Sequence, residues 1–247
     1  MNETRTITTS DGEMSVVVNH PDGDGPFPVV VFFHHGPGLD DGSREAIKTI
    51  SDAGYYVIAP DRYYRHGKLI VMDMHKMMAP DADPADRERF QEIFTGTTDD
   101  MVERDVQAVL GYLKTESPAR PAPMGAIGYC IGARTVLRCI EHHGDVFKVG
   151  ILLHPSFCTT EDSDSPHKVV EGFDGYIYVG IGSEDQMQSP EANKPLIDAV
   201  GGLGDRGNAE VHEGADHGFA VPGAAYHQAA ASRSYAQALD MFEKALA

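Results

Sequence analysis

Short apolar runs, separated by polar and glycine-rich segments, recur along the whole chain. Residues 29–33 are Val-Val-Val-Phe-Phe, and such a continuous run is typical of a strand buried on both faces. Two β-branched segments flank Ser10-Asp11-Gly12, which predicts an antiparallel hairpin over residues 4–18. Further strands are expected at residues 55–59, 124–128, 149–153, 176–181 and 209–212.

Apolar residues at helical spacing fill most of the intervals between these strands. One helix is expected from Asp41 to about Gly54, and another from a cap at Thr97 or Thr98 to Leu113. Others are expected at residues 132–140, 191–200 and 224–246. The alternation of strands and helices predicts an α/β fold with a mostly parallel sheet and helices on both faces. Because no repeat or linker interrupts it, we expect a single domain over residues 1–247.

Residues 61–97 break this regular alternation. The segment is rich in Tyr, Met, Arg and Asp, and we expect a loop and a short helix around residues 84–94. Ligand sites in open α/β sheets lie beyond the carboxyl ends of the strands, so we expect this segment to line a pocket there. Its candidate apolar wall residues, together with one from a later loop, are Tyr63, Tyr64, Met72, Met74, Phe94 and Phe157.

The balance of charge and the cysteine count restrict the partners and the compartment. The 247 residues include 38 Asp and Glu against 20 Lys and Arg, a formal net charge of −18, so nucleic acids and anionic membranes are not expected partners.

Three cysteines favour a reducing compartment over a disulfide framework. We see no signal-peptide pattern and no apolar run near the ~20 residues that span a bilayer, so we expect a cytoplasmic protein, a monomer or small homo-oligomer.

The segment Gly128-Tyr129-Cys130-Ile131-Gly132 follows an expected strand and opens an expected helix. In such a strand–turn–helix the central side chain is exposed on a sharp turn, and flanking glycines remove Cβ atoms that would collide. The helix N-terminus favours a thiolate, and the N–H of Ile131 can face a developing oxyanion. Cys130 is therefore the candidate nucleophile, although a buried cysteine in a glycine-rich turn would give the same sequence.

A candidate acid and a candidate base follow at the ends of later strands. Asp185 comes soon after the strand at 176–181, and His217 follows the strand at 209–212. In this order His217 can accept the thiol proton, and Asp185 can hold the imidazole tautomer. Neighbouring Glu184 is a rival for the second role, and both Asp185 and His217 could instead be ordinary loop residues.

The loop after the strand at 29–33 is His34-His35-Gly36-Pro37-Gly38. A second oxyanion donor is expected from this loop, and a backbone N–H near Gly36 is the candidate. Adjacent histidines can indicate a metal, but these two point in different directions and no carboxylate is spaced to join them locally. We therefore expect no metal ion here.

These motifs resemble those of the dienelactone hydrolase family, a branch of the α/β-hydrolase fold. The match covers nearly the whole chain and is strongest at residues 128–132, 182–185 and 216–219, with further agreement at 59–63. The resemblance implies a Cys130, Asp185 and His217 catalytic triad, an oxyanion hole at the N–H groups of Ile131 and Gly36, and no cofactor. It also implies that Arg87 helps to hold a substrate carboxylate.

Two positions differ from the family pattern. Members that open dienelactones carry a Glu just after the first parallel strand, where this chain has His35, and a second substrate-binding Arg where this chain has Val221. A single cation holds a carboxylate less firmly than a pair, so the resemblance implies hydrolysis more strongly than it implies a dienelactone substrate. With His35 in place of the Glu, we expect Cys130 to rest as a thiolate paired with a protonated imidazole.

The sequence thus predicts a hydrolase that cleaves a small ester or lactone through an acyl-thioester on Cys130, with His35, Arg87 and Phe94 as candidate substrate contacts. Three alternatives remain open. The protein could be a broad short-chain carboxylesterase unrelated to lactones, or a non-catalytic thiol sensor on a hydrolase scaffold. It could also be a metal-dependent hydrolase that uses the loop of His34 and His35.

Overall fold

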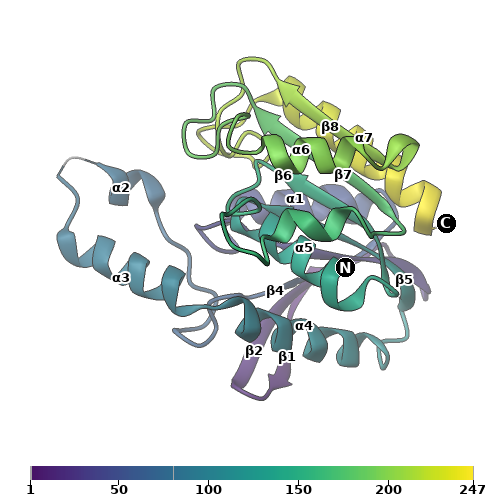
Figure 1. Cartoon of the computed structure of the whole chain (residues 1–247). Coiled ribbons are helices and arrows are strands. Elements are labelled where there is room, and N and C mark those ends of the chain that lie inside the picture. Colours follow the sequence, from purple (N-terminus) through teal and green to yellow (C-terminus); the bar gives the residue numbers. More distant parts are fainter. Residues whose placement is uncertain (1, 80, 247) are drawn as a thin grey trace.

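Eight strands form one mixed sheet in a computed structural model that describes residues 2–79 and 81–246 (Figure 1). In spatial order the strands are β1 (Asn2–Thr9), β2 (Gly12–Asn19), β4 (Tyr56–Pro60), β3 (Phe27–Phe33), β5 (Ala119–Tyr129), β6 (Phe147–Leu153), β7 (Tyr176–Gly182) and β8 (Gly207–His212). The strands from β4 to β8 in this order are parallel, whereas β2 is antiparallel to both β1 and β4. The expected parallel sheet with an antiparallel hairpin at one edge is confirmed.

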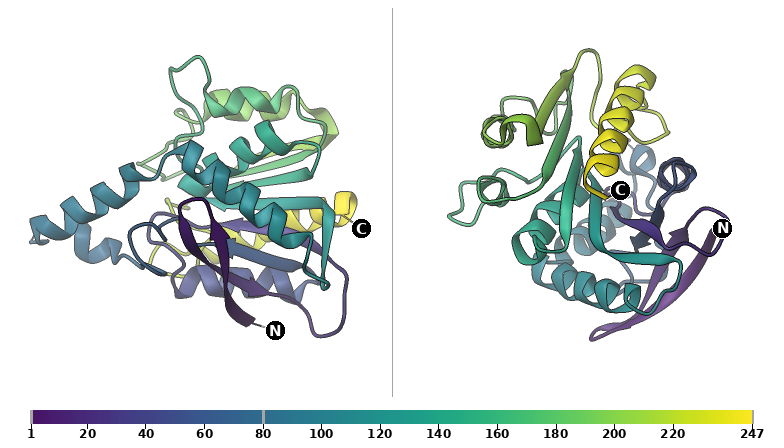
Figure 2. Two further views of the ribbon diagram at one scale, coloured as in Figure 1. Left: turned by 90° about the horizontal axis from the view of Figure 1, so that it is seen from below. Right: turned by 90° about the vertical axis from the view of Figure 1, so that its right-hand side faces the viewer.

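Helices cover both faces of the sheet (Figure 2). The helices are α1 (Asp41–Asp52), α2 (Met74–Met78), α3 (Pro84–Gly96), α4 (Asp99–Leu113), α5 (Ile131–His143), α6 (Lys194–Gly201) and α7 (Gln228–Leu246), with 3-10 turns at Pro166–Val170 and Gly204–Arg206. Of the two cap candidates for α4, Thr98 is the cap and accepts a hydrogen bond from the N–H of Met101. None of the helices in the described part of the chain is long and apolar enough to cross a bilayer.

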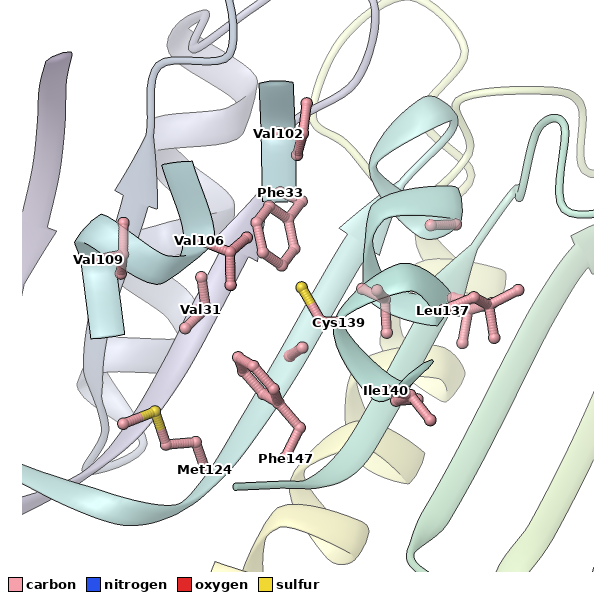
Figure 3. Packing of buried hydrophobic residues seen from close by; sticks show 14 of the residues in the cluster. Val31, Phe33, Val102, Val106, Val109, Met124, Leu137, Cys139, Ile140 and Phe147 are labelled. Carbon is pink, nitrogen blue, oxygen red and sulfur yellow. The ribbon is translucent and has the colours of Figure 1, made fainter. Parts of the chain in front are cut away.

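The side chains of β3 alternate between two separate hydrophobic layers. Val31 and Phe33 pack with residues of α4 and α5, as Figure 3 shows, while Val30 and Phe32 pack on the other face with α1 and α7. Cys139 lies in the first layer and is fully buried, which agrees with the role in packing that its place in a helix suggests. A strand buried on both faces explains why residues 29–33 are apolar without alternation.

The segment 61–97 differs from its predicted form. It contains α2 as well as the expected α3, and both helices project from the body of the molecule rather than covering the sheet (Figures 1 and 2). Ile93 is the buried residue of α3, which therefore has almost no apolar face to pack. Tyr63 and Tyr64, expected as pocket walls, are buried instead and bond to the Gly36 carbonyl and to Asp105.

A buried ion pair ties the hairpin and the loop after β4 to α4. The guanidinium of Arg65 donates to Asp105 at 2.8 Å and to Asp11, in the turn between β1 and β2, at 2.7 Å. Burial raises the pKa of Asp105, while Arg65 and the hydroxyl of Tyr64 oppose that rise. Removing one partner of a buried pair leaves the other charge uncompensated, so the pair fixes how these three segments meet.

We expect Asp105→Ala to lower the free energy of unfolding by about 1–3 kcal/mol, because Arg65 and Tyr64 lose their buried acceptor and Arg65 keeps only the more exposed Asp11. Asp52→Ala is the matched control, since Asp52 forms an exposed pair with Lys48 on α1. That control should change the free energy of unfolding by less than about 1 kcal/mol. Urea unfolding followed by circular dichroism measures both, and equal effects would contradict the importance of the buried pair.

Candidate functional site

Cys130 occupies a sharp turn between the end of β5 and the start of α5. Its backbone has φ of 54° and ψ of −118°, a positive-φ conformation that is unusual for any residue other than glycine. A Cβ atom at Gly128 would lie 2.2 Å from the carbonyl oxygen of Gly132, and one at Gly132 would lie 2.2 Å from that of Phe33. Both glycines are therefore required by the close approach of the backbone, as the sequence predicted.

His217 and Asp185 form a hydrogen-bonded pair beside this turn. The Nδ1 atom of His217 lies 2.7 Å from Oδ2 of Asp185, which is almost completely buried. The other carboxylate oxygen of Asp185 accepts the N–H groups of Met187 at 2.9 Å and Gln188 at 2.8 Å. Glu184 is exposed, so Asp185 is the carboxylate that orients the imidazole.

The pKa values of Cys130 and His217 move in opposite directions. Burial alone would raise the pKa of the thiol, but the nearby ring of His217, the hydroxyl of Ser156 and the N–H of Ile131 outweigh burial and lower it. Burial lowers the pKa of His217, while Asp185 and Cys130 more than compensate and raise it. These shifts favour a thiolate beside an imidazolium, but the cation is His217, whereas the sequence attributed this effect to His35.

Ser156 is a neighbour of the thiol that the sequence analysis missed. Its Oγ atom lies 3.3 Å from the sulfur of Cys130, and its N–H donates to the Cys130 carbonyl at 3.1 Å. The residue follows the carboxyl end of β6, which pairs with β5 in the sheet. Its place just after β6 could have identified it from the sequence, because the carboxyl ends of adjacent parallel strands lie at the same edge of the sheet.

The two expected oxyanion donors belong to different elements. Ile131 is the first residue of α5, and its N–H is close enough to the sulfur to lower the pKa of Cys130. Among the hydrogen bonds of the described residues, none is donated by the N–H of Gly36, whereas its carbonyl accepts from the Tyr63 hydroxyl at 3.0 Å. A Cβ atom at Gly36 would meet no heavy atom within 4 Å, so open space lies beside it.

The adjacent histidines of the same loop bond to different groups. His34 is buried, with Nδ1 placed 2.7 Å from the His35 carbonyl and Nε2 accepting the N–H of Arg62 at 3.2 Å. Burial is the main reason that the pKa of His34 falls to about 3, so the ring is neutral. His35 pairs through Nε2 with Asp40, the N-cap of α1, at 3.0 Å. In the described part of the chain, no three His, Cys, Asp or Glu side chains are grouped so that they could hold a metal ion.

The expected substrate contacts are divided between α3 and this loop. The guanidinium of Arg87 donates to the carbonyls of Met77 at 2.9 Å and Ala79 at 2.5 Å, so its described contacts run to α2 and not to the thiol. The ring of Phe94, near the end of α3, lies 6.2 Å from that of Phe157. His35 is bonded to Asp40 and is not among the groups that shift the pKa of Cys130.

His154, which the sequence analysis did not single out, lies directly against His217. The two ring centroids are 4.9 Å apart in an edge-to-face arrangement, and His154 is completely buried at the end of β6 with φ of 38°. Neither of its ring nitrogens has a hydrogen-bond partner among the described residues, and burial holds its pKa well below the usual value. The ring that contacts the imidazolium is therefore neutral.

Comparison with known proteins identifies relatives over the whole chain. The family model described as the dienelactone hydrolase family matches residues 14–246. A Synechocystis sp. protein provisionally assigned as a carboxymethylenebutenolidase is 22% identical, over 98% of this chain and 96% of that protein. A Methylorubrum extorquens protein assigned in the same way is 23% identical over 59% of this chain, which spans only 46% of that protein's length.

Solved structures agree with the observed topology. A Klebsiella pneumoniae protein provisionally assigned as a dienelactone hydrolase has a TM-score of 0.81, with 18% identity over 99% of this chain and 98% of that one. At this identity the likeness concerns the fold alone, and it supports the α/β-hydrolase architecture.

Gly132→Ala should lower the free energy of unfolding by about 1–3 kcal/mol, because the new Cβ atom must displace the backbone of β3. Gly111→Ala is the matched control. Gly111 lies inside α4, and a Cβ atom there would meet no heavy atom within 4 Å, so alanine should raise the free energy by about 0.5–1 kcal/mol. If urea unfolding showed that both substitutions change the free energy of unfolding in the same direction, it would contradict the tight turn.

Alkylation of Cys130 by iodoacetamide should show a midpoint below pH 8.5, because the lowered thiol pKa keeps the thiolate present as the pH falls. His217→Gln removes the cation and should move the midpoint upward. His35→Gln should leave it unchanged, since His35 pairs with Asp40. Peptide mass spectrometry assigns the label to Cys130, and a wild-type midpoint at or above 8.5 would show that the thiol is not activated.

Proposed function

Because the chain belongs to the dienelactone hydrolase family, whose members hydrolyse lactones or esters, we propose that it cleaves a small ester or lactone by covalent catalysis on Cys130. The observation that carries the proposal is the 2.7 Å hydrogen bond from His217 to the buried Asp185, beside a thiol whose pKa is lowered. A base oriented by a carboxylate and placed next to an activated nucleophile is the arrangement that acyl transfer requires.

In the first half of the proposed reaction the Cys130 thiolate attacks the carbonyl carbon of the substrate. The negative charge that forms on the carbonyl oxygen is stabilised by the N–H groups of Ile131 and Gly36. As the tetrahedral species collapses, the carbon–oxygen bond of the ester breaks, and the imidazolium of His217 donates its Nε2 proton to the departing alkoxide. The products are an alcohol and an acyl-thioester on Cys130.

In the second half, the neutral His217 accepts a proton from water as the hydroxide oxygen bonds to the thioester carbon. The same two N–H groups hold the oxyanion, and the carbon–sulfur bond then breaks. The carboxylic acid leaves, and the thiolate beside an imidazolium is restored. Asp185 accepts the Nδ1–H of His217 throughout, which fixes the tautomer and leaves Nε2 free to exchange the proton.

Two further parts of the proposal concern metal ions and location. The loop of His34 and His35 takes no part in this reaction as a metal site, because both ring nitrogens of His34 are engaged and His35 is paired with Asp40. All three cysteines are free, which supports a cytoplasmic location for the enzyme.

Cys130→Ala should reduce hydrolysis of p-nitrophenyl acetate to the buffer rate, and His217→Ala should reduce kcat by about 10²–10⁴-fold. Cys139→Ala is the matched control, because Cys139 lies in the core toward the opposite end of α5 and should retain activity in the folded protein. A chelator should have no effect. Activity that survives in Cys130→Ala would contradict the thiol mechanism, and loss of activity with the chelator would favour a metal-dependent hydrolase.

A further inference from the structure

Exposed apolar side chains gather around the proposed site. Of the large hydrophobic residues described as exposed, each between 41% and 63%, three lie on loops that also carry site residues, Val71 lies on a loop that pairs with one of them, and Val211 lies on β8. Phe157 follows Ser156, Met187 donates its N–H to Asp185, Val71 pairs with the loop of Gly36 at Gly38, and Tyr226 lies on the loop after His217. Isolated exposed apolar residues are ordinary, but a group around one site marks a surface that binds something apolar.

Phe157 is held in place without being buried. Its backbone has φ of 57°, a left-handed conformation that residues other than glycine rarely adopt. Its carbonyl accepts a hydrogen bond from Arg134 at 2.6 Å, and its N–H donates to the Gln188 side chain at 3.4 Å. Both backbone groups are thus fixed, and the ring remains 45% exposed one residue away from the contact between Ser156 and the thiol.

Two aromatic rings of α3 extend the apolar surface that begins at Phe157. The centroid of Phe94 lies 6.2 Å from that of Phe157, and the centroid of Phe90 lies 5.4 Å from that of Phe94. We call Phe90, Phe94 and Phe157 the aromatic row. The row leads from the neighbourhood of Cys130 onto the projecting helix, and it explains why a helix with almost no buried face carries two half-buried phenylalanines.

The cation that contacts Phe157 is already paired. Arg134, which contacts the Phe157 carbonyl, is paired with Asp99 through Nη2 at 2.7 Å. Arg87, one turn before Phe90 on α3, donates instead to the backbone carbonyls of Met77 in α2 and of Ala79 just after it. The chain as a whole has a formal charge of −18, which repels anions at long range. A carboxylate placed beside Phe157 would lose hydration, and the guanidinium of Arg134 is already engaged by Asp99.

We propose that the site acts on neutral esters with an aromatic or medium-length aliphatic group, and that the aromatic row holds this group beside Cys130. This inference rests on the proposed function and adds the class of substrate to it. Each methylene buried on the row adds favourable burial, so a chain longer by a few carbons gains on the order of tenfold in kcat/KM. A terminal carboxylate on the same chain removes that gain.

The test compares hydrolysis of four esters in a pH-stat: methyl acetate, methyl hexanoate, benzyl acetate and monomethyl adipate, which is a hexanoate-length ester with a terminal carboxylate. The variants are Phe157→Asn, since asparagine tolerates a positive φ, and Val211→Asn as the matched exposed control. We expect kcat/KM for methyl hexanoate or benzyl acetate to exceed that for methyl acetate by about tenfold in the wild type and in Val211→Asn. In Phe157→Asn this ratio of kcat/KM values should fall close to one.

A binding measurement separates this inference from the proposed mechanism. In Cys130→Ala, which forms no acyl-enzyme, titration calorimetry should show tighter binding of hexanamide than of acetamide, and the added Phe157→Asn substitution should abolish the difference. Failure of the mechanism would appear as Cys130-independent hydrolysis while this preference persists. The inference itself is overturned if neither amides nor esters show a preference for the apolar group, if Val211→Asn lowers it as much as Phe157→Asn, or if monomethyl adipate is the best substrate.

Discussion

The carbonyl oxygens of Phe33 and His34 occupy the space that a side chain at residue 132 would need. Because Gly132 leaves that space free, the first turn of α5 can pack directly against the end of β3. This contact decides where the other parts of the site lie. It places Cys130 at the carboxyl end of the central strand β5, next to the loop of Gly36 on one side and next to Ser156 at the end of β6 on the other.

Local charge around the thiol is arranged independently of the acidic surface. The net charge of −18 would disfavour another anion, yet the thiolate form of Cys130 is favoured because His217 is held cationic within the same buried region. Asp185 in turn accepts three hydrogen bonds, from the N–H groups of Met187 and Gln188 and from Nδ1 of His217. Interactions across a few ångströms in a region of low dielectric constant outweigh distant charges that water and salt screen.

The sequence was most informative where backbone geometry restricts the residue type. The apolar run of β3 and the glycines around Cys130 each follow from a local requirement, so the sheet and the turn could be predicted without knowing their surroundings. The positions of side chains that depend on distant partners could not be predicted in this way. The pairing of His35 with Asp40, the contact of Ser156 with sulfur and the direction of Arg87 depend on how loops pack, and no periodic pattern records that. The projection of α3 was missed for the same reason.

The adjoining rings of His154 and His217 form a unit that can hold only one positive charge. A second proton on His154 would place two cations 4.9 Å apart between ring centroids, inside a region from which water is excluded. The neutral ring of His154 contacts both His217 and Tyr129, so an apolar, uncharged surface lies against the imidazolium on this side. The two faces of the His217 pair are therefore unequal: Asp185 accepts at Nδ1, and the neutral ring of His154 lies against the imidazole.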